Sequence, residues 1–175
     1  FTDLNTFKSP RLLVSPTGNL LVSGVFSGLS SITVGDVPIE PLDSTFSARN
    51  HFVASIDPIS NTCEHAFCAY GIQTPQNDFP AWEVDEDGNI FLGFGLNASL
   101  PTYTPALTVG SNTFNTSPNR SFIAKFSETG GLLSLQRHTD QVFTSFVKAA
   151  GGGIWALSRF DRAVGFHNPD GSATG

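Results

Sequence analysis

A chain of 175 residues corresponds to one domain or slightly more, and it is long enough to bury a sizeable hydrophobic core. Its nine lysines and arginines, against fifteen acidic residues, provide no basic patch for a run of phosphates, which argues against nucleic acid as a partner. No apolar stretch approaches the roughly 18 residues of a membrane span, so we expect no membrane insertion. Seventeen glycines, eleven prolines and sixteen phenylalanines, with frequent Val, Ile, Thr and Ser, predict an all-β fold.

An apolar run, a tight turn with a glycine and a second apolar run recur three times along the chain. This order is the signature of a β-hairpin. The turn glycines are Gly18, Gly88 and Gly152, which are 70 and then 64 residues apart. The copies are LLVSPTGNLLVSG at 12–24, WEVDEDGNIFLGF at 82–94 and FVKAAGGGIWALS at 146–158.

A second pair of strands repeats in phase with these hairpins. HFVASIDPIS at 51–60 matches SFIAKFSETG at 121–130, and RAVGFHNPDG at 162–171 is a weaker third copy. A further apolar segment follows each of the first two copies, so the repeating unit is four antiparallel strands. We expect strands near 11–16, 19–27, 50–57 and 63–71 in the first unit, 81–86, 89–96, 120–127 and 131–138 in the second, and 143–149, 153–159 and 162–168 in the third.

Four-stranded units in tandem predict β-propeller blades, about two and a half in this chain. We assign residues 1–10 to the last strand of a preceding blade or a linker, 11–80 and 81–140 to two blades, and 141–175 to a partial third. Closing a propeller takes at least about four blades. We therefore expect the partners to include the remaining blades of the same protein or other copies of this chain.

The pattern of an apolar strand, a Gly-Asn turn, an apolar strand ending in Gly and an aromatic "FVAxID" strand resembles the SBBP repeat of bacterial seven-bladed propellers. It is carried by Ser15, Gly18, Asn19, Gly24 and 52–57, and again by Asp85, Gly88, Asn89, Gly93 and 122–126. The third copy departs from it at Gly153 and His167. The resemblance implies a secreted or cell-surface protein, and its motifs are structural, so it implies location more than activity.

The two cysteines, Cys63 and Cys68 in CEHAFC, are close enough in sequence to form a small disulfide loop in an oxidising compartment. The alternatives are two reduced, buried thiols or half of a metal site. No second Cys pair or nearby His pair completes four metal ligands. We predict the disulfide.

The segment DEDGN at 85–89 places Asp85 and Asp87 at alternate positions before a glycine, as in a fragment of a calcium loop. The further acidic ligands of a full loop are missing, and the same residues suit a hairpin turn. A turn is therefore the preferred interpretation, with calcium as a weak alternative and no other metal or cofactor expected.

No catalytic residue is predicted. The four histidines, His51, His65, His138 and His167, are scattered on or beside predicted strands, and the sequence contains no GxSxG elbow or HExxH motif. Trp82 and Trp155 could stack on a sugar, although burial between neighbouring blades is the more common role of such residues. We assign both tryptophans, together with Phe52, Phe91, Phe122 and Phe126, to packing.

Two long inserts, 28–49 and 97–119, separate the second and third strands of the first two units and share a TVG core at 33–35 and 108–110. Both should emerge at one rim of a propeller, where long polar loops usually bind partners. They equally suit a structural role, with the TVG core as an extra strand-like element. Asn97 and Asn119 match the glycosylation acceptor pattern. The candidate binding residues are Asp36, Asp43, Arg49, Tyr103, Asn112 and Arg120.

A repeat scaffold of this kind favours a non-enzymatic extracellular or cell-surface module for adhesion, scaffolding or ligand binding, with a surface protein or a glycan as its partner. Two alternatives stay open. One is a secreted propeller hydrolase whose active site lies in blades outside this segment. The other is a carbohydrate-binding lectin assembled from several propeller segments.

Overall fold

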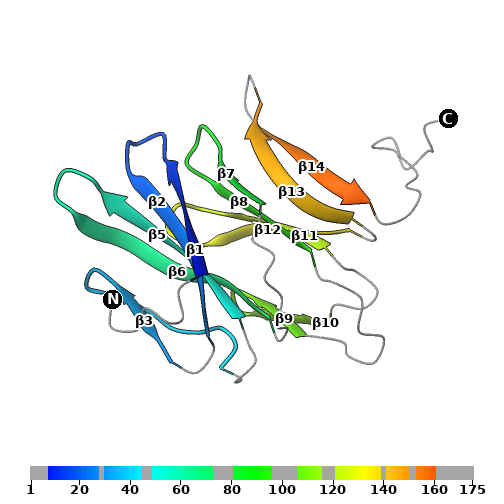
Figure 1. Cartoon of the computed structure of the whole chain (residues 1–175), viewed down its shortest axis with the longest axis horizontal. Coiled ribbons are helices and arrows are strands. Elements are labelled where there is room, and N and C mark those ends of the chain that lie inside the picture. Colours follow the sequence, from blue (N-terminus) through cyan, green and yellow to red (C-terminus); the bar gives the residue numbers. More distant parts are fainter. Residues whose placement is uncertain are drawn as a thin grey trace.

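The computed structural model describes residues 8–27, 30–44, 49–72, 81–95, 106–115, 121–138, 141–149 and 153–160 (Figure 1). These residues form antiparallel β-strands and no helix, which confirms the all-β prediction. They accordingly contain no helix that could cross a membrane. The strands are β1 (Lys8–Val14), β2 (Leu20–Ser27), β3 (Ile32–Val34), β4 (Val37–Ile39), β5 (Arg49–Asp57), β6 (Thr62–Ile72), β7 (Ala81–Val84), β8 (Ile90–Gly95), β9 (Ala106–Val109), β10 (Asn112–Asn115), β11 (Ser121–Phe126), β12 (Leu132–His138), β13 (Gln141–Lys148) and β14 (Ile154–Phe160).

The strands pair in the units that the repeat predicts. β1, β2, β5 and β6 are neighbours in that order in the first unit, and β7, β8, β11 and β12 in the second. In the third, β13 pairs with β14 as an antiparallel hairpin, and the expected strand at 162–168 lies outside the described residues. β1 begins at Lys8, so residues 8–10 belong to the first unit, while the strand expected before it falls on residues 1–7, which are also outside.

The repeated turns share one hydrogen-bond pattern, which explains why the sequence repeats there. In the β1–β2 turn, Ser15 N–H donates to Asn19 O and Gly18 N–H donates to Ser15 O. The β7–β8 turn repeats these bonds from Asp85, and the β11–β12 turn repeats them from Ser127. The glycine in each turn has a positive φ, 92° at Gly18, 82° at Gly88 and 90° at Gly130, a conformation in which other residues are strained. Gly152, expected in the third hairpin turn, lies outside the described residues.

Each unit has two faces, because alternate side chains of a strand point to opposite sides of the sheet. We call the face that includes Leu12, Val14, Leu20 and Val22 in the first unit the leading face. Its equivalents in the second unit, 70 residues later, are Trp82, Val84, Ile90 and Leu92. The opposite face, which includes Leu13 and Leu21 in the first unit, is the trailing face.

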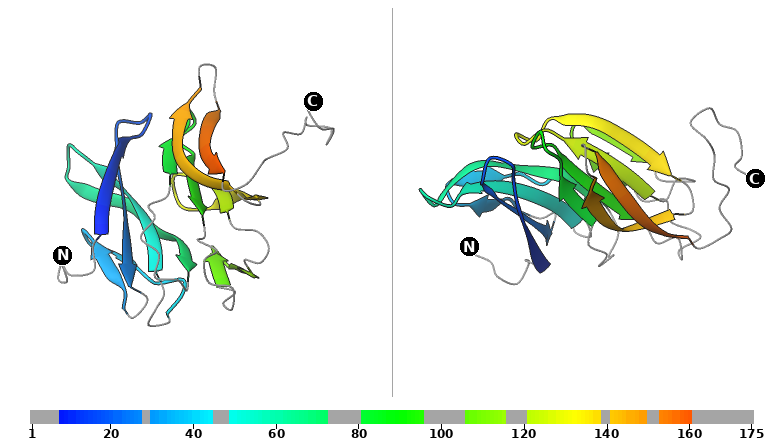
Figure 2. Two further views of the ribbon diagram at one scale, coloured as in Figure 1. Left: turned by 45° about the vertical axis from the view of Figure 1, so that its right-hand side comes forward. Right: turned by 90° about the horizontal axis from the view of Figure 1, so that it is seen from above.

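The trailing face of the first unit packs on the leading face of the second. Leu21, Val53 and Ala69 form one buried cluster with Trp82, Ile90, Leu92, Phe122 and Ala124. At the edge of this contact the Phe67 and Phe126 rings lie 5.5 Å apart. Gly130 borders the Phe67 ring so closely that a Cβ at Gly130 would lie 2.5 Å from it. The two sheets are therefore stacked face to face, as the ribbon shows from two directions (Figure 2).

The same arrangement recurs between the second and third units. Ala81, Phe91 and Ile123, on the trailing face of the second unit, pack against Phe146 and Ile154 of the β13–β14 hairpin. The predicted core positions Phe52, Phe122 and Phe126 are fully buried, and Phe91 is half-buried in this contact, which confirms their packing role.

Both inserts contain β-hairpins that turn at the TVG cores. Gly35 and Gly110, the glycines of these cores, have nearly identical φ angles of 58° and 57°. The β3–β4 hairpin packs on the leading face of the first unit, whereas β9 of the other insert pairs with β6. Val109 lies opposite Tyr70 and Thr108 opposite Gly71, so the insert of the second unit extends the sheet of the first to six strands.

The two leading faces allow a matched test of the stacking. Val84 and Val14 are equivalent valines, but Val84 is 2% exposed and Val14 is 62% exposed. We expect Val84→Ala to lower the free energy of unfolding by about 2 kcal/mol, because it removes two buried methyl groups and leaves a cavity. Val14→Ala should change it by less than about 0.5 kcal/mol.

Chemical denaturation of both variants at low protein concentration measures this difference. Equal losses in the two variants would contradict the observed arrangement of the units.

Candidate functional site

The inserts occupy one edge of the sheets, opposite the hairpin turns β1–β2, β5–β6 and β7–β8 (Figures 1 and 2). Their apolar sides are buried: Val34 and Ile39 in the β3–β4 hairpin, and Leu107 and Val109 in β9. Their polar sides face outward. We call the exposed residues Thr33, Asp36, Glu40, Asn112 and Thr113 the insert surface.

A buried amide holds the first insert in place. Asn50, on β5, is fully buried; its Oδ1 accepts the Asp43 N–H at 3.0 Å and its Nδ2 donates to Asp43 O at 2.9 Å. Gly71 on β6 leaves the space for this crossing, because a Cβ there would lie 2.8 Å from the Asp43 nitrogen. The segment after β4 is therefore fixed against the sheet by a polar contact with little room to move.

Of the six predicted binding residues, two lie on the insert surface. Asp36 is in the β3–β4 turn and Asn112 opens β10, and both are exposed. Arg49 begins β5 and is half-buried. Asp43 is 7% exposed, so it does not lie on a surface that a partner meets, and the prediction that placed it there is corrected. Tyr103 and Arg120 lie outside the described residues, as do the acceptor sites Asn97 and Asn119.

Three residues of the insert surface were not among the binding residues predicted from the sequence. Thr33 and Glu40 flank the buried positions of the β3–β4 hairpin, and Thr113 pairs with Thr108 across β9–β10, with their hydroxyl oxygens 3.1 Å apart. Alternation around Val34 was the signal that could have placed Thr33 outward.

The predicted Cys63–Cys68 disulfide is wrong, because both residues are free thiols. They lie on the single strand β6, where five residues of extended chain span roughly 16 Å. A disulfide requires the two Cα atoms within about 7 Å of each other. Both side chains instead pack beside the cluster of Phe26, Phe52 and Val34. The alternative of two reduced thiols is the one that the structure supports, with both side chains partly buried.

The two thiols should differ in reactivity in the folded protein. Burial raises the pKa of Cys68 to about 12, and burial also raises the pKa of Cys63, which is less enclosed. Because the thiolate is the reactive form, we expect iodoacetamide to label Cys63 before Cys68 at neutral pH. Both should react in denaturant without any reductant.

Mass spectrometry of the labelled protein checks this order, and the variant Cys63→Ser isolates the slower thiol. Failure of both cysteines to react in denaturant before reduction would show a disulfide after all.

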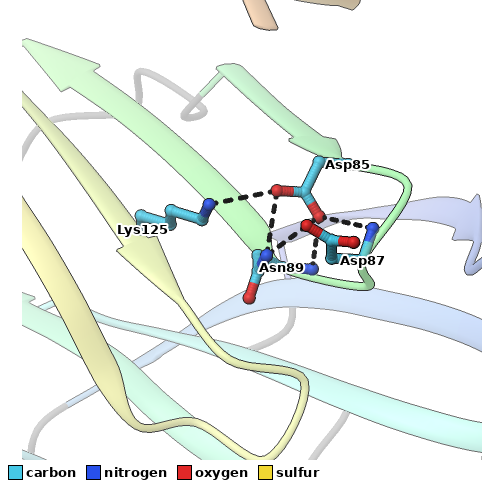
Figure 3. A network of polar contacts seen from close by, with 4 residues as sticks. All are labelled: Asp85, Asp87, Asn89 and Lys125. Carbon is cyan, nitrogen blue, oxygen red and sulfur yellow. Dashed lines mark hydrogen bonds and ion pairs between the residues drawn. The ribbon is translucent and has the colours of Figure 1, made fainter. Parts of the chain in front are cut away.

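The DEDGN segment is a hairpin turn whose first carboxylate is held by donors from the same turn (Figure 3). Asp85 Oδ1 accepts the N–H of Asp87 at 3.1 Å and of Asn89 at 2.8 Å, and both carboxylate oxygens accept from Asn89 Nδ2. Lys125 Nζ lies 3.2 Å from Asp85 Oδ2. The Asp85 carboxylate is thus occupied by hydrogen bonds and an ion pair that hold the turn. These contacts favour the turn interpretation over a calcium site.

The electrostatics of Asp85 agree with this role. Burial alone would raise the pKa of Asp85, but the hydrogen bonds from Asn89 and the Lys125 ammonium outweigh it and hold the pKa below its usual range. Across the part of the chain that the structure describes, no group of three or more His, Cys, Asp or Glu residues could hold a metal ion.

The three histidines in the described part of the chain lie in different environments. His51 is buried on β5 and stacks on the Tyr70 ring with centroids 5.1 Å apart, whereas His65 is exposed on β6 and His138 ends β12. His167 lies outside the described residues. Burial, with the nearby Arg11 charge, lowers the pKa of His51 to about 3, so this imidazole is neutral near pH 7 and is not suited to exchange protons there.

His51 should make stability depend on pH. Above pH 6.5 its imidazole is neutral in both the folded and the unfolded chain. Between pH 6.5 and about 3 only the unfolded chain binds the proton, so the free energy of unfolding should fall by about 1.4 kcal/mol per pH unit on acidification. His51→Phe should remove this component of the slope.

Urea denaturation between pH 7 and 4.5 measures the difference between the variant and the native chain. His65→Gln, which leaves His51 unchanged, is the matched control and should keep the slope. An unaltered slope in His51→Phe would contradict the burial of an uncharged His51.

The two tryptophans have different environments. Trp82 is 7% exposed in the contact between the first two units, as its packing role predicts. Trp155 is 72% exposed on β14, so the prediction that it is buried is wrong within this chain. Its side chain lies on the trailing face of the third unit, where no further sheet covers it among the described residues.

Comparison of the chain with protein-family models, with curated proteins and with solved structures found no match.

Proposed function

We propose that this chain is a β-propeller segment that acts outside the cell as a binding module, with the insert surface as the region that meets a glycan or a surface protein. The propeller proposal is supported by the tandem four-stranded sheets, which stack leading face on trailing face in both observed contacts. It is also supported by the resemblance to the SBBP repeat, and the extracellular location rests on that resemblance.

The binding role is supported mainly by one observation: the insert hairpins have one buried apolar side and one exposed polar side. Each hairpin buries its apolar side and is fixed to a sheet, so the outward carboxylates, amide and hydroxyls are displayed on a rigid base. Asp36, Glu40 and Asn112 are the polar side-chain types that bond to sugar hydroxyls or to donors on a protein surface. A rigid display lowers the conformational entropy that binding has to overcome.

The test compares two double variants with the same change in charge. Asp36→Ala with Glu40→Ala removes two exposed carboxylates from the insert surface, and Glu86→Ala with Asp87→Ala removes two from the β7–β8 turn at the opposite edge. We expect the first to weaken binding to a printed array of glycans and extracellular-matrix proteins by about tenfold or more, and the second to leave it unchanged.

Equal losses in both double variants would indicate a general charge effect and contradict a site at the inserts. Absence of binding by the native chain to every probe on the array would contradict the binding role itself.

A further inference from the structure

The two ends of the sheet stack expose apolar faces. At one end, the leading face of the first unit leaves Leu12 64% and Val14 62% exposed. At the other end, the trailing face of the third unit leaves Val147 57%, Trp155 72% and Leu157 65% exposed. Large apolar side chains gathered on one face of a sheet are typical of a contact surface.

Comparison with the equivalent residues of the other units shows which contact each exposed face could make. Leu12 and Val14 are equivalent to Trp82 and Val84, which are 7% and 2% exposed because the trailing face of the first unit covers them. At the other end, Trp155 is equivalent to Phe91 in the second unit, which packs on a leading face.

The two exposed faces are thus the two complementary halves of a contact that the chain already makes twice. They are also compatible in charge. The described side chains of the open part of the leading face are Leu12, Val14, Leu20 and Val22, and those of the open trailing face are Ser145, Val147, Trp155 and Leu157. Neither of these four-residue sets contains a charged side chain, so the contact between these residues desolvates no ion.

We propose that a second copy of this chain binds head to tail, with its trailing face at Trp155 on the leading face at Leu12 and Val14. The contact joins unlike surfaces, so each copy of a pair still has one free face. Further copies can therefore extend the pair into an open chain or close it into a ring. The two faces lie at the ends of the stack and include no residue of the insert surface.

Sedimentation velocity across a series of protein concentrations tests the proposal with two face variants. Leu12→Glu places a charge on the leading face and Trp155→Glu places one on the trailing face, both at exposed positions that the folded monomer tolerates. The native chain should grow beyond a dimer as its concentration rises. Each variant alone should associate at least about tenfold more weakly than the native chain, because every contact would bury a charge.

An equimolar mixture of the two variants distinguishes head-to-tail binding from a symmetric dimer. The Trp155→Glu chain keeps a native leading face and the Leu12→Glu chain keeps a native trailing face, so the mixture should form a heterodimer and stop there. Ile59→Glu is the control: Ile59 is 91% exposed in the β5–β6 turn, away from both faces, and the variant should associate like the native chain.

Fluorescence of the Trp82→Phe variant supplies a local readout, because Trp155 is then the sole tryptophan. Its emission should shift to the blue as association buries it. A native chain that stays monomeric at every concentration, or a Trp155→Glu chain that associates as the native one does, would overturn the proposal. Asp36→Ala with Glu40→Ala should not alter association, which separates this test from that of the insert surface.

Discussion

Both faces of each four-stranded sheet carry apolar side chains, and the need to bury two faces at once governs the arrangement of the chain. A sheet with one polar face could stand with that face in water, but in the second unit Leu92 on one side and Ala81 on the other are both buried by a neighbouring unit. The solution is a stack, in which each sheet is covered by the next. Each Å² of apolar area buried in this contact stabilises the fold by about 25 cal/mol.

The two edges of the stack serve different purposes. At the turn edge, polar side chains of the turns bond to neighbouring strands and turns. Asn19 Nδ2 lies 2.6 Å from Glu64 Oε2 on β6 and 3.2 Å from Ser55 Oγ on β5. Thr17 Oγ1 lies 3.4 Å from Glu128 Oε1, which links two units. At the insert edge, the polar groups of the β3–β4 hairpin face outward from a buried base. That contrast is why the insert edge is the stronger candidate for a partner.

The local part of this fold could be predicted from the sequence, and the non-local part could not. Gly18 and Gly88 repeat because a turn with a positive φ demands them, so the hairpins and their strand order were visible. The pairing of β9 with β6 joins residues from different units, and no local pattern encodes it. The cysteine prediction was wrong because close spacing was taken as a loop, although β6 runs as one strand through both residues.

At the candidate site, the exposed position of Asp36 could be predicted, because Asp36 is a polar residue next to the turn glycine Gly35. The burial of Asp43 did not, because it depends on the amide of Asn50 and the missing side chain of Gly71, which lie on two other strands. Trp155 was assigned to packing because such residues are commonly buried between neighbouring blades, and it is exposed because no further sheet covers its face among the described residues.

The pairing of β9 with β6 also determines how the chain comes apart. Because strands from the second unit extend the sheet of the first, the boundary between the repeats in the sequence does not separate two independent sheets. In tandem-repeat proteins, a strong coupling between neighbours merges separate melting steps into one. A cut between β6 and β7 would therefore not release an intact first sheet, since it would leave Tyr70 without the strand that lies beside it.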